Sequence, residues 1–150
     1  MRAVVQRVSR ASVTVGGRVT GEINRGLLVL LGVAAGDTAD DSDWLAGKIA
    51  SLRIFADAGD RMNLCLRETD GQALVVSQFT LLGSVRKGSR PSFNAAAAPA
   101  LARTLYEGFV ARLAQELRRP VPTGEFAALM EVALVNDGPV PLILDTRDRS

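Results

Sequence analysis

The sequence has no histidine in its 150 residues. Imidazole is the side chain that most readily gains and loses a proton near neutral pH, and many enzymes use it as general base or metal ligand. Its absence excludes Ser-His-Asp and Cys-His catalysis. If the protein hydrolyses a bond, carboxylates, water, backbone groups or the substrate itself must handle the proton.

Cysteine is almost absent too, because Cys65 stands alone. A single thiol forms no intrachain disulfide and no multi-cysteine zinc site, and the sequence predicts neither a metal nor a cofactor. Between Leu64 and Leu66, Cys65 is expected to be a small core residue and not a nucleophile. This cysteine usage fits a cytoplasmic protein.

Long hydrophobic runs are also missing. The longest apolar stretch, residues 26–36, is far shorter than the ~20 residues that cross a bilayer. Met1 is followed by alternating polar and apolar residues, so we expect no signal peptide and no membrane binding. The formal charge of +2 permits a nucleic-acid partner, but it describes an ordinary mixed-charge surface equally well.

What is present predicts one domain over residues 1–150. Aromatic residues make up only 5% of the chain, so Val, Leu, Ile and Ala must fill the core. A chain of this length buries about 68–70% of its unfolded surface, which is enough to fold without disulfides or metal.

The hydrophobic pattern predicts mostly strands and two helices. Thr38 and Asp41 resemble the start of a helix whose buried face carries Leu45, Ile49 and Leu52. A second helix is predicted from Pro99 to Leu117, with an apolar residue at every fourth position from Leu101. Strands are predicted at 2–15 (as one strand or two), 18–23, 27–33, 53–55, 72–82, 127–135 and 140–144, with a loop at 121–125, a sharp turn at 136–139 and a frayed tail from 146.

These elements predict an α/β fold in a single domain. We expect mixed, largely antiparallel β-sheets packed in a barrel-like arrangement, with the two main helices on one face.

Three segments carry candidate site residues. In an unbroken strand, Gln78 and Thr80 share one face while Ser77 and Phe79 share the other, so the polar pair either lines a pocket or faces solvent.

The second segment, residues 86–93, combines cations with an aromatic ring. Arg86, Lys87 and Arg90 suit phosphate contacts and Phe93 can stack on a base, although such a run is also typical of a solvated loop. The third segment is the Gly138-Pro139 turn, which either presents carbonyl oxygens to a site or only connects two strands.

Together these segments resemble the D-aminoacyl-tRNA deacylase family. That family has a Ser-Gln-Phe-Thr strand, found here at 77–80, and an Asn-x-Gly-Pro-Val-Thr turn, found here at 136–140 without its final threonine. The order and spacing agree from residue 1 to about 145. Further matches lie at 5–8, 11–13, 90–93, 123–124, 126 and 130.

The resemblance implies an enzyme that hydrolyses the ester between a D-amino acid, or glycine, and tRNA. It also implies a homodimer in which the Gly-Pro turn of one subunit enters the active site of the other. The Gly138-Pro139 peptide would be cis, although residue type alone predicts trans. Its carbonyls would hold the substrate α-amino group, and the turn would reject an L side chain by a clash.

For the chemistry we favour backbone N–H groups around residues 77–80 as oxyanion donors. The resemblance further implies that the ribose 2′-hydroxyl of the substrate helps to activate water, with Gln78 positioning the adenosine or the water. Thr80 as covalent nucleophile is the competing mechanism, but the motif offers no adjacent base. Pro141 stands where the family has threonine, which removes a hydroxyl and a backbone N–H.

Two other functions remain open at this point. One is a non-catalytic RNA-binding homodimer that uses residues 86–93. The other is a relative that mainly removes glycine from mischarged tRNA.

Overall fold

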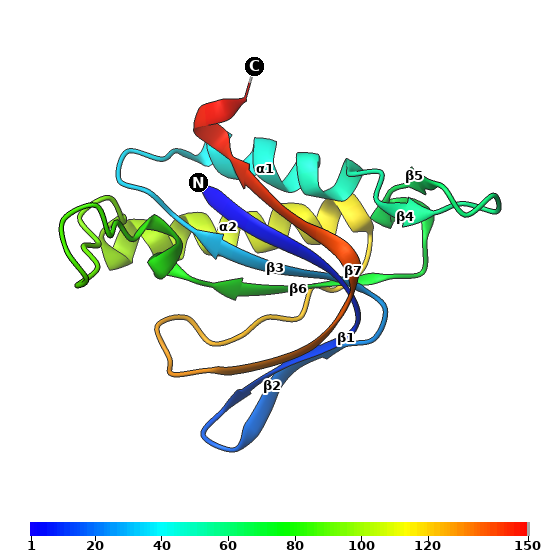
Figure 1. Ribbon diagram of the computed structural model, residues 1–150, viewed down its shortest axis with the longest axis horizontal. Coiled ribbons are helices and arrows are strands. Elements are labelled where there is room, and N and C mark those ends of the chain that lie inside the picture. Colours follow the sequence, from blue (N-terminus) through cyan, green and yellow to red (C-terminus); the bar gives the residue numbers. More distant parts are fainter. Residues whose placement is uncertain (150) are drawn as a thin grey trace.

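The structure, a computed structural model, describes residues 1–149 and contains one curled sheet backed by two helices (Figure 1). The sheet has the order β2-β1-β3-β6, with β7 paired to β1. Its pairs are antiparallel except for β3 with β6. The strands are β1 (Arg2–Val15), β2 (Arg18–Ile23), β3 (Gly26–Gly32), β6 (Gln72–Ser77) and β7 (Glu131–Asp145).

β1 is the strand that organises the sheet. Its first half pairs with β3, its second half pairs with β2, and β7 follows it along almost its whole length. The sheet therefore curls into a half-barrel, which confirms the predicted fold class (Figure 1).

Both helices lie on the same face of the sheet, as predicted (Figure 1). Helix α1 (Ala39–Ser51) begins where Asp41 Oδ2 accepts a hydrogen bond from the backbone N–H of Thr38, 2.9 Å away. Helix α2 (Pro99–Leu117) buries the predicted stripe except for Leu101, which is 38% exposed. The main core lies between these helices and the sheet.

A second, smaller core lies on the other face of the sheet. Its buried residues are Val8, Ala11, Val13, Ile23, Leu28, Leu74 and Val76. Met130 and Val132 pack against it. Met130 and Val132 also line the candidate site, so the smaller core supports one side of it.

The remaining elements are short. A two-stranded ribbon, β4 (Phe55–Ala56) with β5 (Met62–Leu64), replaces the strand predicted at 53–55. Three 3₁₀ turns complete the described residues: η1 (Leu66–Glu68), η2 (Phe79–Leu82) and η3 (Thr146–Asp148). Cys65 is half-buried beside η1. No helix in residues 1–149 is both long and apolar enough to cross a membrane.

The strand predicted at 72–82 is wrong beyond Ser77. The backbone N–H of Gln78 still donates to the carbonyl of Leu31, at 2.7 Å, but β3 ends one residue later and offers no further partner. The chain then turns into η2 instead of extending the ladder. Gln78 and Thr80 therefore do not share a strand face.

The turn predicted at 136–139 is a bulge within one strand. Val8 pairs with Asn136 and Gln6 pairs with Pro141, so Arg7 alone stands opposite residues 137–140. β7 continues through this bulge, and it begins at Glu131 instead of at residue 127.

Residues 146–149 of the tail predicted to be frayed are held in place instead, and residue 150 lies outside the described residues. The Met1 ammonium is buried and contacts Asp37 Oδ2 at 2.7 Å and the Thr146 hydroxyl at 2.6 Å. The backbone N–H of Thr146 donates to the Met1 carbonyl, so the two chain ends fix each other.

Candidate active site

An apolar pocket of about 550 Å³ opens beside the end of β6. Three segments far apart in the sequence form its wall: the Ser77–Phe79 end of β6, the start of α2 with the residues before it, and the loop that leads into β7. The lining residues are Val33, Ser77, Gln78, Phe79, Ala96, Ala97, Pro99, Ala102, Phe126, Ala127, Ala128, Leu129, Met130 and Val132.

Within residues 1–149, no ionisable side chain lines this pocket. Two ionisable side chains contact Phe126 without lining the pocket: the Arg103 guanidinium carbon lies 5.1 Å from the centroid of the Phe126 ring, and the centroid of the buried Tyr106 ring lies 5.8 Å from it. Burial raises the pKa of Tyr106, and the Glu107 charge adds to this, while a hydrogen bond with Thr123 opposes it. Tyr106 is therefore a neutral structural residue at neutral pH, and the polar atoms at the pocket wall are hydroxyl, amide and backbone groups.

The structure brings three of the four predicted catalytic residues to the pocket. Ser77, Gln78 and Phe79 line it, whereas Thr80 does not. Gln78 Nε2 donates a hydrogen bond to the Thr80 hydroxyl at 2.5 Å, so Thr80 acts on the site through the glutamine amide.

Gly32 allows this part of the chain to approach β3 closely. A Cβ at Gly32 would lie 2.5 Å from Leu82 Cδ2 and 3.0 Å from the Gln78 carbonyl. The absence of a side chain at Gly32 therefore sets where η2 begins relative to the sheet.

The loop at 126–130 is a wall of the pocket that the sequence patterns did not reveal. Apolar residues there predicted a strand from 127, but Ala127 has a φ of 64° and turns the chain back over the pocket. Leu129 projects into solvent and is 95% exposed. Gly124 packs closely against this loop: a Cβ there would lie 2.6 Å from Met130 Sδ, so a larger residue would require the Met130 side chain to move.

The basic segment 86–93 lies next to the pocket but does not line it. Phe93 packs edge-on against Phe79, with 5.1 Å between the ring centroids. Arg86, Lys87 and Arg90 are exposed. Their predicted contacts with phosphate stay a prediction.

The Gly138-Pro139 bulge lies outside this pocket of its own chain. Its peptide bond is cis, as the resemblance implied and against the expectation from residue type. Arg7, of which 13% of the side chain is exposed, holds the bulge: Nε donates to the Asp137 carbonyl at 3.0 Å and lies 3.2 Å from Asp137 Oδ2. The other end of the guanidinium donates to the Ile54 carbonyl at 2.6 Å.

Comparison with known proteins identifies the family of this chain. The sequence model of D-Tyr-tRNA(Tyr) deacylase matches residues 4–145. The chain is 60% identical to a D-aminoacyl-tRNA deacylase of Opitutus terrae over 149 residues, which is 99% of both chains. It is 59% identical to one of Koribacter versatilis over 148 residues, or 98% of both.

The chain belongs to the D-Tyr-tRNA(Tyr) deacylase family. This confirms the resemblance read from residues 77–80 and 136–140, and with it the expectation of a hydrolase of this family.

Solved structures agree with the deacylase fold. The c-Myc DNA Unwinding Element Binding Protein superposes with a TM-score of 0.91 at 41% identity, covering 97% of this chain and 98% of the other. A probable eukaryotic D-amino acid tRNA deacylase superposes with a TM-score of 0.84 at 16% identity, covering 95% and 97%, and supports the fold alone.

The one departure from the family motif is accommodated by the edge of the sheet. Pro141 pairs with Gln6, and within residues 1–149 β7 has β1 as its sole partner strand. Proline has no N–H to donate, so it is tolerated where one side of a strand is unpaired.

Proposed function

We propose that this protein hydrolyses the ester that links a D-amino acid, or glycine, to the terminal adenosine of tRNA. The observation that carries the proposal is the match to the family over residues 4–145 together with an apolar pocket lined by Ser77, Gln78 and Phe79. An aminoacyl-adenosine has a flat apolar base and a small polar ester, and a largely apolar pocket with a few polar groups suits such a ligand.

The catalytic groups are proposed to be backbone N–H groups at the start of η2. The first N–H groups of a helical turn have no partner within it, so that of Phe79, which lines the pocket, is free to stabilise an oxyanion. Losing one such donor elsewhere costs roughly 2.7–4 kcal/mol, which is enough for backbone geometry to carry much of the rate. Gln78 positions the adenosine or the attacking water.

The proton is proposed to be handled with help from the substrate. Because no ionisable side chain lines the pocket, the ribose 2′-hydroxyl of the terminal adenosine is our candidate for activating the water. Hydrolysis adds the water oxygen to the ester carbonyl carbon, and the bond to the ribose oxygen breaks, with a proton passing to that oxygen. A tRNA that ends in 2′-deoxyadenosine tests this step: undiminished hydrolysis would exclude the 2′-hydroxyl.

Thr80 as a covalent nucleophile is the competing mechanism. Its hydroxyl accepts the hydrogen bond from Gln78 and lies outside the pocket lining, which argues against direct attack. We expect Thr80→Val to keep the fold and lose at most about tenfold in kcat, since it removes only an indirect hydrogen bond of about 1 kcal/mol. Complete loss of activity in a folded Thr80→Val protein would favour the nucleophile.

Chirality is proposed to be sensed by the Gly138-Pro139 bulge of a partner subunit. The bulge lies away from the pocket of its own chain, and Arg7 fixes it there, so it is available to a second copy. In the partner's pocket its carbonyls would hold the substrate α-amino group, and an L side chain would strike the main chain while a D side chain points away.

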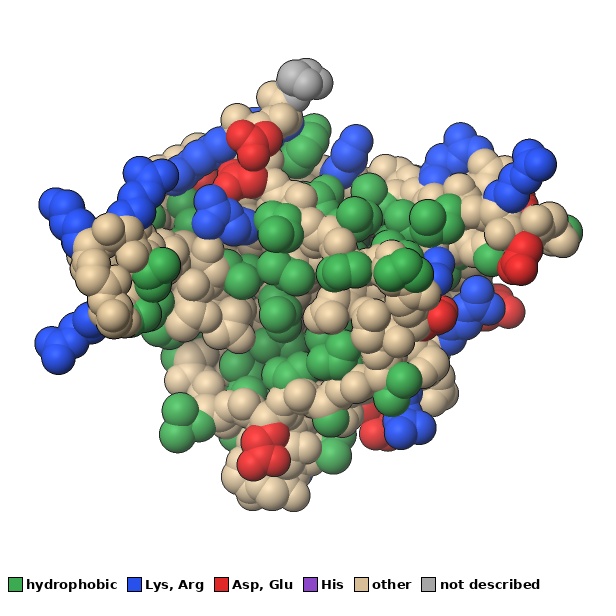
Figure 2. Space-filling model, in the orientation of Figure 1, with side chains coloured by type: hydrophobic (Ala, Val, Ile, Leu, Met, Phe, Trp, Pro, Cys, Tyr) green, Lys and Arg blue, Asp and Glu red, His purple; other side chains and the backbone are tan. Residues whose placement is uncertain are grey.

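Exposed apolar residues on and beside β7 support such a homodimer. Hydrophobic side chains gather across the middle of the face along which β7 runs, with Lys and Arg towards its sides (Figure 2). Ile143 is 75% exposed, Leu134 36% and Val135 41% in the single chain. An apolar strand with an open edge is a ready surface for pairing with another chain.

The decisive experiment is multiple-turnover deacylation. With D-tyrosyl-tRNA in large excess, the enzyme is expected to release many equivalents of D-tyrosine, whereas a non-catalytic RNA-binding dimer would bind tRNA in a salt-dependent way and release none. Turnover of glycyl-tRNA in the same assay separates a broad deacylase from one that mainly removes glycine. Absence of turnover with both substrates would overturn the proposal.

A further inference from the structure

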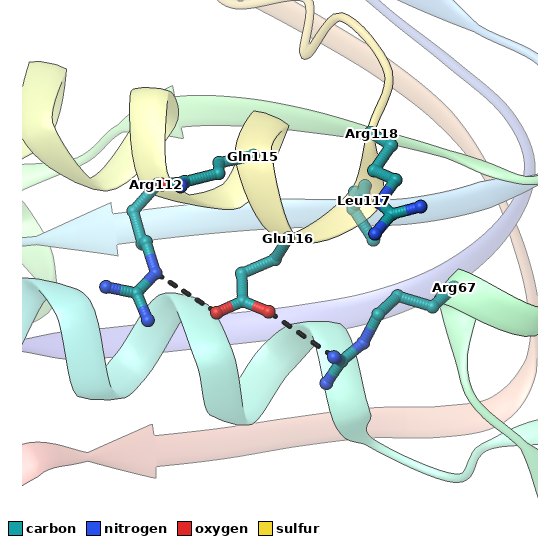
Figure 3. Close-up of a pocket in the computed structure, with 6 residues that line it drawn as sticks. All are labelled: Arg67, Arg112, Gln115, Glu116, Leu117 and Arg118. Atoms are coloured by element: carbon teal, nitrogen blue, oxygen red, sulfur yellow. Dashed lines mark hydrogen bonds and ion pairs between the residues drawn. The ribbon is translucent and has the colours of Figure 1, made fainter.

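A charged pocket of about 820 Å³ lies at the C-terminal end of α2, away from the apolar pocket (Figure 3). Figure 3 shows the Glu116 carboxylate between the guanidinium groups of Arg112, from α2, and Arg67, from η1, with Arg118, which follows α2, apart from them. The lining residues are Arg67, Arg112, Gln115, Glu116, Leu117 and Arg118.

Glu116 holds two of these arginines in place. Its Oε1 accepts a hydrogen bond from Arg112 Nε at 3.0 Å, and its Oε2 lies 3.3 Å from Arg67 Nη1 (Figure 3). The Glu116 side chain is 19% exposed, whereas those of Arg67 and Arg112 are 42% and 39% exposed. The carboxylate is thus more enclosed than the cations, which keep donors free for a ligand.

The pocket has an excess of positive charge. Its lining has three arginines against one carboxylate, Glu116, while two further carboxylates outside the lining, Asp43 at 3.7 Å from Arg112 and Glu68 near Arg67, offset part of this charge. Arg118 lies exposed where α2 ends, in the left-handed conformation with a φ of 55°, and its side chain makes no hydrogen bond or ion pair within residues 1–149. Arginine forks match phosphate oxygens, and arginines already held in position lose little entropy on binding.

The two pockets lie at opposite ends of one rigid element. Pro99 and Ala102, in the first turn of α2, line the apolar pocket, and Glu116, in its last turn, lines the charged one. At 1.5 Å per residue the helix separates them by about 20 Å. A large ligand with one end in the apolar pocket can therefore reach the charged pocket along α2.

We propose that the charged pocket binds a backbone phosphate in the body of the RNA whose 3′ end occupies the apolar pocket. This inference rests on the proposed function, because it takes the RNA to be the substrate. It assigns Arg67, Arg112 and Arg118 to substrate binding at a distance from the reacting ester. The bound phosphate affects the affinity for the whole RNA and leaves the chemical step unchanged.

The test compares a long and a short substrate with the double variant R67Q/R118Q. Arg112 stays, so Glu116 keeps a partner and the fold is preserved. For D-tyrosyl-tRNA we expect KM to rise about tenfold at unchanged kcat, and the slope of log affinity against log salt to fall by about one to two, since two phosphate-contacting cations are lost. For the D-tyrosyl ester of a CCA trinucleotide, which is too short to span α2, both constants should stay unchanged.

Arg18→Gln is the matched control, because it removes an exposed cation from β2 without touching either pocket. An unchanged KM for the full tRNA in R67Q/R118Q, or an equal rise with the trinucleotide or in R18Q, would overturn the inference. Titration of uncharged tRNA with the same three proteins keeps the test separate from the proposed function. Weaker binding by R67Q/R118Q alone supports the charged pocket even if the wild type hydrolyses nothing, and equal binding by all three proteins refutes it.

Discussion

At the scale of single residues, Arg7 connects three parts of the molecule. From β1 it reaches the bulge through the Asp137 carbonyl and carboxylate and reaches the carbonyl of Ile54 with its other end. A guanidinium presents its donors in a fixed fork, so one side chain defines the position of the bulge relative to the sheet. Arg7 therefore fixes the bulge, which is the proposed chiral element, without lining the apolar pocket.

Arg7→Lys tests this role. Lysine keeps the charge but is a point donor that cannot hold both carbonyls, so we expect about 1–3 kcal/mol of lost stability and about a tenfold fall in the preference for D- over L-tyrosyl-tRNA. The exposed Arg10 on the same strand provides the control Arg10→Lys, with neither effect expected. Chemical denaturation and parallel rate measurements give both numbers. An Arg7→Lys enzyme with unchanged preference would remove Arg7 from the account.

At the scale of elements, the sequence predicted what depends on local periodicity. The 3.6-residue pattern placed both helices, the 2-residue alternation placed β1, and the continuous apolar run at 27–33 placed β3, because these patterns report which faces are buried. The strand-like pattern continues through residues 77–82, past the end of β6. The partner strand β3 stops at Gly32, however, and nothing in the sequence of β6 indicates where β3 ends.

Local sequence pattern also predicted only part of the candidate site. Ser77, Gln78, Phe79, Gly138 and Pro139 were found through motifs, but the bulge at 137–140 depends on an arginine 130 residues away. The loop at 126–130 was predicted as the start of a strand because alanine does not mark a left-handed turn, and Ala127 adopts one against its preference. Contacts between distant segments determine these features, so the local sequence pattern could not predict them.

Gly32→Ala tests whether the position of η2 limits the rate. The new Cβ would press on the backbone carbonyl of Gln78, so η2 must shift and its N–H groups with it. We expect kcat to fall about tenfold or more, because a small displacement of oxyanion donors is costly. The control is Gly108→Ala in α2, where the Cβ would meet Ser42 Oγ at an ordinary 3.9 Å. This helix substitution should add roughly 0.5–1 kcal/mol of stability and leave kcat unchanged. Equal kcat in the two variants would contradict the role of η2.

At the scale of the whole molecule, the apolar surface of β7 predicts a dimer that completes the site. Ile143→Glu places a charge on this surface, so light scattering should show dimers for the wild type and monomers for the variant. Deacylation should fall in parallel, because the partner's bulge is lost. Met62→Glu is the control, since Met62 is 59% exposed on β5, apart from β7. A monomeric wild type, or a fully active monomeric Ile143→Glu variant, would refute the shared site.

The absence of histidine also predicts how the stability of the protein depends on pH. Burial acts to raise the pKa of Asp145, but hydrogen bonds from the Arg147 N–H and from Arg2, with the Arg2 charge, outweigh it and lower the pKa below its ordinary value. A carboxyl with a lowered pKa in the folded state adds stability that is present above its unfolded pKa of about 3.9 and is lost as pH falls through the folded value. The free energy of unfolding should thus change little between about pH 6 and 8 and decline below about pH 4. Asp145→Asn should make this acid decline shallower, and a steep loss of stability between pH 5 and 7 would contradict the assignment.

The most direct measurement is the ratio of deacylation rates on matched D- and L-tyrosyl-tRNA, two substrates that differ at one stereocentre. A main-chain wedge beside an uncharged pocket predicts rapid release of D-tyrosine, with L-tyrosyl-tRNA decaying no faster than without enzyme. Equal enzymatic rates on the two substrates would show that the Gly138-Pro139 bulge does not read handedness.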